Sequence, residues 1–161
     1  MPEGTRPKGT PMRIALASDH AAYDLKTGIA RYLTVRAVPF DDLGCGPGES
    51  VDYPEYAAKA AERVLSGACD RAILCCGTGI GMAVAANKFK GIRATPCWSV
   101  FTAEVSRKHN DSNCLSLGGR TLGLDETLEI VRVWLETPFE GGRHARRVDE
   151  IKALEELHFK A

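Results

Sequence analysis

The chain has 161 residues, of which 44% are hydrophobic and 26% charged, and its 21 basic side chains balance 21 acidic ones. This length and composition predict one compact domain, and the neutral charge argues against a nucleic-acid-binding protein. No apolar run approaches a membrane span and the first residues lack the apolar core of a secretory leader, so we expect a cytoplasmic protein without membrane contact.

The domain organisation is predicted to be simple. Residues 1–11 mix proline, glycine and charge without periodicity and are expected to form a mobile tail, followed by a single domain over residues 12–161. In that domain short apolar runs alternate with segments of helical spacing. The first helical segment, for example, carries Leu25, Ile29 and Leu33 four residues apart.

The alternation of the two patterns predicts the fold class. Strands are expected over residues 13–18, 36–40, 71–75, 92–96 and 113–117. Further helices are expected over residues 54–65 with Asp52 as the cap, from about Gly81, and over residues 99–109, 124–135 and 144–158. Repeated strand–helix order predicts a doubly wound, Rossmann-like parallel sheet of five strands in a three-layer α/β arrangement.

Two of the predicted helices carry apolar stripes. Leu124, Leu128, Val131 and Leu135 lie in phase on one of them, and Val148, Ile151, Leu154 and Leu157 recur at three-residue intervals on the last. Because five strand–helix pairs already cover the sheet, we expect the last stripe to pack on a neighbouring subunit. The alternative, a helix folded back on its own domain, stays open.

Residues 73–87 form the most informative segment. An apolar run ends in Cys75 and Cys76, glycines follow at positions 77, 79 and 81, and small helix-forming residues come next. This order predicts a strand, a tight loop and a helix, in which backbone N–H groups approach an anion closely and favour a thiolate at Cys76. The glycine spacing fits neither a dinucleotide fingerprint nor a Walker loop, so a small anionic ligand is expected.

The remaining cysteines and the histidines do not indicate a metal site or a disulfide framework. None of the six cysteines forms a C-x-x-C pair, and the four histidines show no H-x-x-x-H spacing. Cys69, Cys97 and Cys114 are expected to be small core residues. Cys75 and Cys76 are expected on opposite faces of their strand.

Other candidate site residues are ambiguous when taken alone. Asp19 and His20 follow the first strand, where an acid often caps a helix and a histidine is often a surface residue. His109 ends a helix, where it complements the helix dipole. Arg143 and Arg147 lie four residues apart, which suits either a phosphate site or a solvated basic face.

Taken together, these segments resemble one family. The glycine-rich run, with Ser18-Asp19-His20, Asp52-Tyr53-Pro54, His109-Asn110-Asp111 and Gly141-Gly142-Arg143-His144, is similar to ribose-5-phosphate isomerase type B from about Arg13 to Phe159. The resemblance implies an aldose–ketose isomerase of the non-oxidative pentose phosphate pathway. It would interconvert ribose 5-phosphate and ribulose 5-phosphate through ring opening and an enediolate. Members are dimers or tetramers that share active sites between subunits.

The resemblance also implies roles for individual residues. Cys76 matches the base, and His109 matches the ring-opening acid, assisted by Asp19 and Thr78. No metal or organic cofactor is implied. The positions that match substrate contacts, the phosphate site included, are Asp19, His20, Tyr53, Gly77, Thr78, Gly79, Ile80, Gly81, Asn110, Arg120, Arg143 and Arg147.

Two alternatives stay open at this point. Sister enzymes act on allose 6-phosphate and galactose 6-phosphate, and residues 98–100 carry no charged or imidazole group that would select between five- and six-carbon sugars. A non-catalytic sugar-phosphate-binding subunit, with Cys76 merely packed, is the other alternative.

Overall fold

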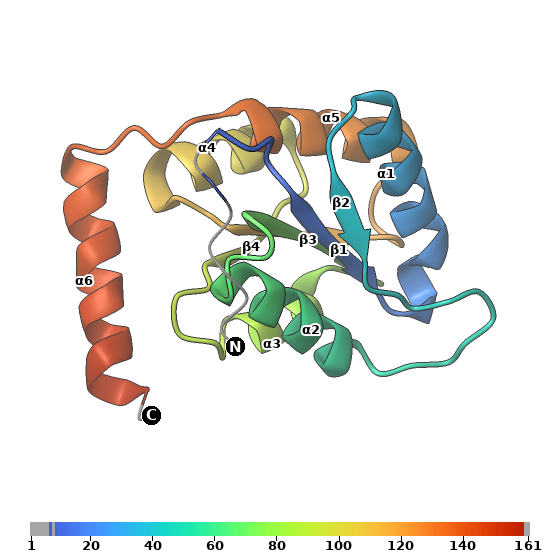
Figure 1. Ribbon diagram of the computed structural model, residues 1–161, viewed down its shortest axis with the longest axis horizontal. Coiled ribbons are helices and arrows are strands. Elements are labelled where there is room, and N and C mark those ends of the chain that lie inside the picture. Colours follow the sequence, from blue (N-terminus) through green and yellow to red (C-terminus); the bar gives the residue numbers. More distant parts are fainter. Residues whose placement is uncertain (1–6, 8, 160–161) are drawn as a thin grey trace.

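A five-stranded parallel sheet forms the centre of the computed structural model, which describes residues 7 and 9–159 (Figure 1). Its strands are β1 (Ile14–Ser18), β2 (Phe40–Asp42), β3 (Arg71–Cys76), β4 (Ala94–Pro96) and β5 (Cys114–Gly118), in the order β2-β1-β3-β5-β4. The predicted doubly wound parallel sheet is therefore confirmed. Most of the predicted tail, residues 1–6 and 8, lies outside the described residues.

Helices cover both faces of the sheet (Figure 1). On one face, α2 (Tyr53–Leu65) and α3 (Ile80–Ala86) pack in a hydrophobic cluster with Ala17 and Leu74 of the sheet. On the other face, α1 (Tyr23–Val35), α4 (Val100–Asn110) and α5 (Leu124–Glu136) pack in a second cluster with Leu16 and Ile73. A 3-10 turn, η1 (His20–Ala22), joins β1 to α1. Within the described residues no helix has both the length and the apolar character needed to cross a bilayer.

The second strand begins later than predicted. Residues 36–40 were expected to form it, but α1 continues to Val35 and the N–H of Arg36 bonds to carbonyls of that helix. Ala37 adopts a positive φ of 54°, and the N–H of Val38 donates to the Leu33 carbonyl, so the chain turns here before β2. Residues 36–38 therefore form a turn, and pairing with β1 begins only at Phe40, the last residue of the expected strand.

Three smaller predictions are also corrected. The fourth strand begins at Ala94, two residues later than expected, because the N–H of Ile92 donates to Phe89 in a turn. Asp52 occupies the N-cap position of α2 as expected, but its side chain makes no capping hydrogen bond. The buried face of α5 is Thr127, Ile130, Val131 and Trp134, so the expected stripe is rotated and Leu124 is exposed.

The last helix, α6 (Arg143–His158), belongs to neither layer and stands beside the body of the molecule (Figure 1). Its side chains His144 and Val148 are buried, whereas Leu154 and Leu157 are 57% and 70% exposed. Near its far end, the Glu155 carboxylate accepts the Gly91 N–H at 3.1 Å. Most of the apolar stripe on α6 is therefore uncovered within one chain.

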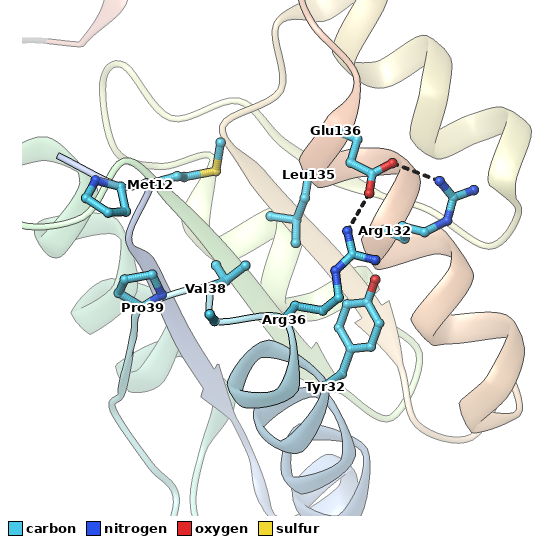
Figure 2. Close-up of a pocket in the computed structure, with 10 residues that line it drawn as sticks. Met12, Tyr32, Arg36, Val38, Pro39, Arg132, Leu135 and Glu136 are labelled. Carbon is cyan, nitrogen blue, oxygen red and sulfur yellow. Dashed lines mark hydrogen bonds and ion pairs between the residues drawn. The ribbon is translucent and has the colours of Figure 1, made fainter. Parts of the chain in front are cut away.

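An apolar cavity of about 220 Å³ lies between the C-terminal ends of α1 and α5 (Figure 2). Two ion pairs line it, because Glu136 accepts from Arg36 at 2.6 Å and from Arg132 at 2.8 Å. Met12 and Pro39, which precede β1 and β2, place this cavity at the amino edge of the sheet. The cavity is therefore separate from the carboxyl edge, where the glycine-rich loop lies.

Candidate active site

The glycine-rich loop lies at the point where the strand order reverses. β2 lies on one side of β1 and β3 on the other, so the chain leaves the sheet in opposite directions after β1 and β3. Asp19 follows β1, Cys76 ends β3, and the N–H of Asp19 donates to the Cys75 carbonyl at 3.1 Å. The two side chains thus come from adjacent strand ends, where open α/β sheets bind their ligands.

The two adjacent cysteines have different surroundings. Cys75 is fully buried in the cluster with α1, α4 and α5, and burial raises the pKa of its thiol. Cys76 belongs to the cluster with α2 and α3, is 4% exposed, and its sulfur accepts the Gly79 N–H at 3.2 Å. The predicted contrast between a buried Cys75 and a Cys76 next to the loop is confirmed. The expected core cysteines Cys69, Cys97 and Cys114 are also buried.

The loop conformation requires glycine at position 79. Gly79 has φ = 81°, and a Cβ there would lie 3.0 Å from the backbone of Leu117 on β5. The Ser116 hydroxyl donates to the Gly79 carbonyl at 2.5 Å, which fixes the peptide orientation. This turn directs the Gly79 N–H to the Cys76 sulfur, and the Ile80 N–H donates to the Thr78 hydroxyl at 3.3 Å. Two N–H groups of the expected anion cradle therefore contact the candidate catalytic side chains themselves.

Two longer side chains lie against the loop, at its other glycines. A Cβ at Gly77 would be 3.2 Å from Nη1 of Arg120, and one at Gly81 would be 2.7 Å from the ring of Tyr53. The N–H of Arg120 donates to the Gly77 carbonyl at 2.9 Å, so the arginine is anchored beside the loop by its own backbone. Arg120 and Tyr53 are both exposed, and they lie against Gly77 and Gly81, near the two ends of the glycine-rich loop.

Asp19 and His20 complete this edge of the sheet. Asp19 is 7% exposed and, among the described residues, its Oδ1 is buried without a hydrogen-bond partner, so a ligand hydroxyl would satisfy it. Nδ1 of His20 lies 3.1 Å from the Val51 nitrogen and 3.0 Å from the Val51 carbonyl oxygen, so the backbone of Val51 holds the ring in place on either tautomer. A cavity of about 340 Å³ opens beside His20.

His109 and Asn110 lie at the opposite edge. α4 starts after the carboxyl end of β4 and runs back along the sheet, so it ends near the amino end of β5. Arg93, which precedes β4, donates to the Asn110 carbonyl at 3.1 Å and confirms this position. A five-residue strand is about 17 Å long. His109 is therefore remote from Cys76 of the same chain.

The start of α6 packs on His109. Gly141 and Gly142 have φ of 68° and 56°, and this turn stacks the His144 ring on the His109 ring at a centroid distance of 4.1 Å and an interplanar angle of 9°. Burial lowers the pKa of His144, and the nearby charges of His109 and Arg143 lower it further. The lowered pKa favours a neutral His144 ring. The exposed Arg143 and Arg147 follow on the same helix.

The structure thus divides the candidate residues into two groups. The carboxyl-edge group comprises Asp19, His20, Tyr53, Cys76, Thr78, Arg120 and the loop residues Gly77, Gly79, Ile80 and Gly81. The amino-edge group comprises His109, Asn110, Arg143 and Arg147. His144 and Glu140, whose side-chain atoms Nε2 and Oε2 are 3.6 Å apart, were not among the candidates. The Gly141-Gly142 turn before a histidine was the one sequence feature that pointed to them.

The fold and the carboxyl-edge group define an α/β protein with a thiol, a carboxylate and a glycine loop at the switch point of a parallel sheet. A family model described as Ribose/Galactose Isomerase matches residues 14–151. The chain therefore belongs to the Ribose/Galactose Isomerase family.

Individual relatives extend over almost the whole chain. Ribose-5-phosphate isomerase B of Escherichia coli is 45% identical over 89% of this chain and 97% of its own length. D-erythrulose-4-phosphate isomerase of Pectobacterium atrosepticum is 40% identical over 87% of this chain and 93% of its own. The structure of Clostridium thermocellum ribose-5-phosphate isomerase B superposes with a TM-score of 0.90 at 50% identity, covering 91% of this chain and 99% of that one.

Proposed function

We propose that this protein is an aldose–ketose isomerase that interconverts ribose 5-phosphate and ribulose 5-phosphate. The observation that carries the proposal is the Cys76 thiol, which accepts an N–H from the glycine loop at the switch point. On the adjacent strand end, Oδ1 of Asp19 is buried without a hydrogen-bond partner among the described residues. The relatives named ribose-5-phosphate isomerase B, in E. coli and C. thermocellum, support the substrate class.

The proposed reaction starts with ring opening of the sugar, in which His109 protonates the ring oxygen and Asp19 accepts the proton of the anomeric hydroxyl. The Cys76 thiolate then removes the proton from C2 of the open aldose, giving an enediolate and a neutral thiol. The thiol returns this proton to C1 while the C2 hydroxyl proton passes to the C1 oxygen, so that C1 becomes a hydroxymethyl group and the C2 oxygen becomes the ketose carbonyl. Backbone N–H groups of the loop and the Thr78 hydroxyl stabilise the enediolate oxygens, a contribution of about 3 kcal/mol for a well-placed donor.

Phosphate binding is assigned to cationic groups from both edges. His20 and Arg120 lie at the carboxyl edge, and Arg143 and Arg147 at the amino edge. Arginine forks suit a phosphate because they donate two parallel charge-assisted hydrogen bonds. The phosphate would therefore be held between residues that one chain keeps apart.

We further propose that the active unit is a homodimer, or a tetramer built from it, in which the amino-edge group of one subunit meets the carboxyl-edge group of its partner. The separation of the two groups supports this assembly, because neither group holds both the base and the ring-opening acid. The uncovered stripe of α6 supports it too: a groove of about 480 Å³ separates α6 from the β4 edge and is lined by apolar residues that include Ile92, Ala94, Ile151, Leu154 and Phe159. The cytoplasm is the proposed location, and neither nucleic acid nor membrane is a proposed partner.

A second candidate substrate is D-erythrulose 4-phosphate, because a relative that covers most of the chain is named for it. Both substrates are short sugar phosphates and need the same base and phosphate anchor. Six-carbon phosphates are the third choice, since the family description includes galactose isomerase.

The test is an isomerase assay of the purified chain, in buffer with EDTA, on ribose 5-phosphate, D-erythrulose 4-phosphate, allose 6-phosphate and galactose 6-phosphate. We expect the highest kcat/KM for ribose 5-phosphate and no loss of activity after prolonged EDTA treatment. A higher value for another sugar would reassign the substrate. Loss of activity that Zn²⁺ or Mg²⁺ restores would contradict the metal-free mechanism, and binding without turnover would favour the non-catalytic subunit.

A further inference from the structure

Three potential metal ligands converge at the junction of α4 and α6. His109 ends α4, Glu140 lies in the linker after α5, and His144 lies in the first turn of α6. One ligand atom from each lies within 4.8 Å of the others, and within the described residues no other such group of three or more occurs. The spacing along the sequence did not indicate this cluster because His109 and His144 come from different helices.

The backbone holds the three residues in place. The Glu140 N–H donates to the Lys108 carbonyl at 3.1 Å, which ties the linker to the end of α4 next to His109. The His144 N–H donates to the Gly141 carbonyl at 3.0 Å and closes the turn that stacks the two rings. These hydrogen bonds hold the backbone of the three residues together without using their ligand atoms. Stacked rings direct their in-plane nitrogen lone pairs along parallel planes, so an ion bound by both histidines requires the half-buried His109 ring to rotate out of the stack.

The donor set suits a transition metal. Two imidazoles and one carboxylate are a known zinc ligand set that keeps a fourth position open, whereas Mg²⁺ prefers oxygen ligands only. Zinc bonds of about 2.0–2.2 Å place tetrahedral ligand atoms roughly 3.4 Å apart. Nε2 of His144 and Oε2 of Glu140 are already 3.6 Å apart. Glu140 has a half-exposed side chain that can adjust, while His144 is 5% exposed.

The positive charges around the cluster lower its expected affinity for a metal ion but do not prevent binding. Arg143 and Arg147 lie close enough to act on His144, and their charge opposes a cation. Lys108 is paired with Glu104, so its charge is partly compensated. We therefore expect reversible binding rather than a permanently held structural ion.

We propose that His109, Glu140 and His144 form an inhibitory site for a divalent transition-metal ion, with Zn²⁺ as the ion that fits best. A metal on His109 would occupy the ring nitrogen that the proposed reaction uses for ring opening. The inhibition rests on the proposed function, but the binding does not. The site is thus a means by which metal availability controls the isomerase.

Binding is tested without reference to activity, in the Cys76→Ala variant, which removes the other candidate zinc ligand of the site. Zn²⁺ titration by calorimetry, with Co²⁺ absorption as a probe of ligand geometry, should give one ion per chain and no heat with Mg²⁺. Adding Glu140→Gln should weaken Zn²⁺ binding at least about tenfold. Glu126→Gln, an exposed carboxylate on α5 outside the cluster, is the matched control and should leave the affinity unchanged. Equal affinity with and without Glu140→Gln, or loss of binding with Cys76→Ala alone, would overturn the site.

Inhibition is tested in the chain with Cys76 intact. Zn²⁺ should inhibit, EDTA should restore the rate, and Glu140→Gln should keep the metal-free rate while requiring at least about tenfold more Zn²⁺ for half inhibition. Equal inhibition of both forms would overturn the regulatory role. A chain that binds Zn²⁺ at the cluster but isomerises no sugar phosphate would overturn the proposed function and the inhibition, and leave the metal site standing.

Discussion

At the residue scale, the chemistry depends on a contrast between two neighbouring thiols. Successive strand residues face opposite sides of a sheet, so Cys75 points into the cluster with α1, α4 and α5 while Cys76 lies on the side of α2 and α3. The Cys76 sulfur accepts an N–H of the glycine loop, whereas burial raises the pKa of the Cys75 thiol and keeps it neutral. One of the two is therefore suited to act as a base.

Substituting each cysteine should separate these roles. Cys76→Ala is expected to lower the isomerase rate by at least about 100-fold, because a general base is lost, while a sugar-phosphate analogue still binds. Cys75→Ala should keep the rate and cost on the order of 1 kcal/mol of stability through a small core truncation. Rates, analogue affinity and melting temperatures of both variants are the measurements. A Cys76→Ala protein that keeps a tenth of the rate would mean that another group takes the proton.

The proposed role of His109 predicts an effect that depends on whether the substrate forms a ring. Ribose 5-phosphate is mostly a closed ring, whereas erythrose 4-phosphate, the aldose counterpart of D-erythrulose 4-phosphate, cannot close a furanose through its phosphorylated 4-hydroxyl. His109→Ala should therefore lower kcat/KM for ribose 5-phosphate by about 10²–10⁴, equally in both directions because the equilibrium constant fixes their ratio, and should affect erythrose 4-phosphate much less. Assays on both aldoses test this, and equal losses on the two would place His109 in the proton transfer or in binding instead.

At the element scale, the side chain of Asp41 connects the β2 edge of the sheet to neighbouring segments. Its carboxylate accepts from Nε of Arg13 at 2.9 Å and from the Cys69 thiol at 3.5 Å, and it lies 3.9 Å from Arg63. The hydrogen bonds from Arg13 lower the pKa of Asp41, and burial raises the pKa of Cys69 to about 12. The ionised carboxylate thus connects β2 to the segments before β1 and β3 and to α2.

This linkage has a predictable pH dependence. Because the folded state lowers the pKa of Asp41, its contribution is complete above the unfolded value of about 3.9 and is lost as pH falls through the folded value. Asp41→Asn should therefore destabilise the protein at pH 7 by on the order of 1 kcal/mol, and the difference should shrink in acid. Chemical denaturation at pH 7 and pH 3 measures it. A difference that stays constant with pH would show that Asp41 acts through packing.

Elements with a local pattern were predictable and those set by tertiary contacts were not. The alternation of buried runs and helical spacing predicted the parallel sheet, and the glycine run predicted the loop beside Cys76. The second strand was placed too early, because a positive φ at Ala37 turns an apolar segment that otherwise resembles a strand. The pairing of His144 with His109 depends on a turn after α5 and on contact between distant helices, which no local spacing contains.

At the scale of the whole molecule, the candidate residues of one chain lie at two edges of the sheet. The parallel topology requires this, since a helix that follows β4 returns to the amino edge before β5. An isomerase that needs both groups must therefore combine two chains, and α6 offers an uncovered apolar stripe for that contact. A C2 dimer would form two equivalent sites, each with one group from either subunit.

Mixed refolding of two inactive variants tests this account most directly. Cys76→Ala removes the base from one edge and Arg147→Ala removes a phosphate ligand from the other, so each homodimer has two defective sites. A hybrid dimer has one doubly defective site and one intact site. Since half of randomly formed dimers are hybrids, the mixture should recover about a quarter of the activity of the unmodified protein. Hybrids that form in the expected amount but restore no activity would place each complete site within a single chain and contradict the account.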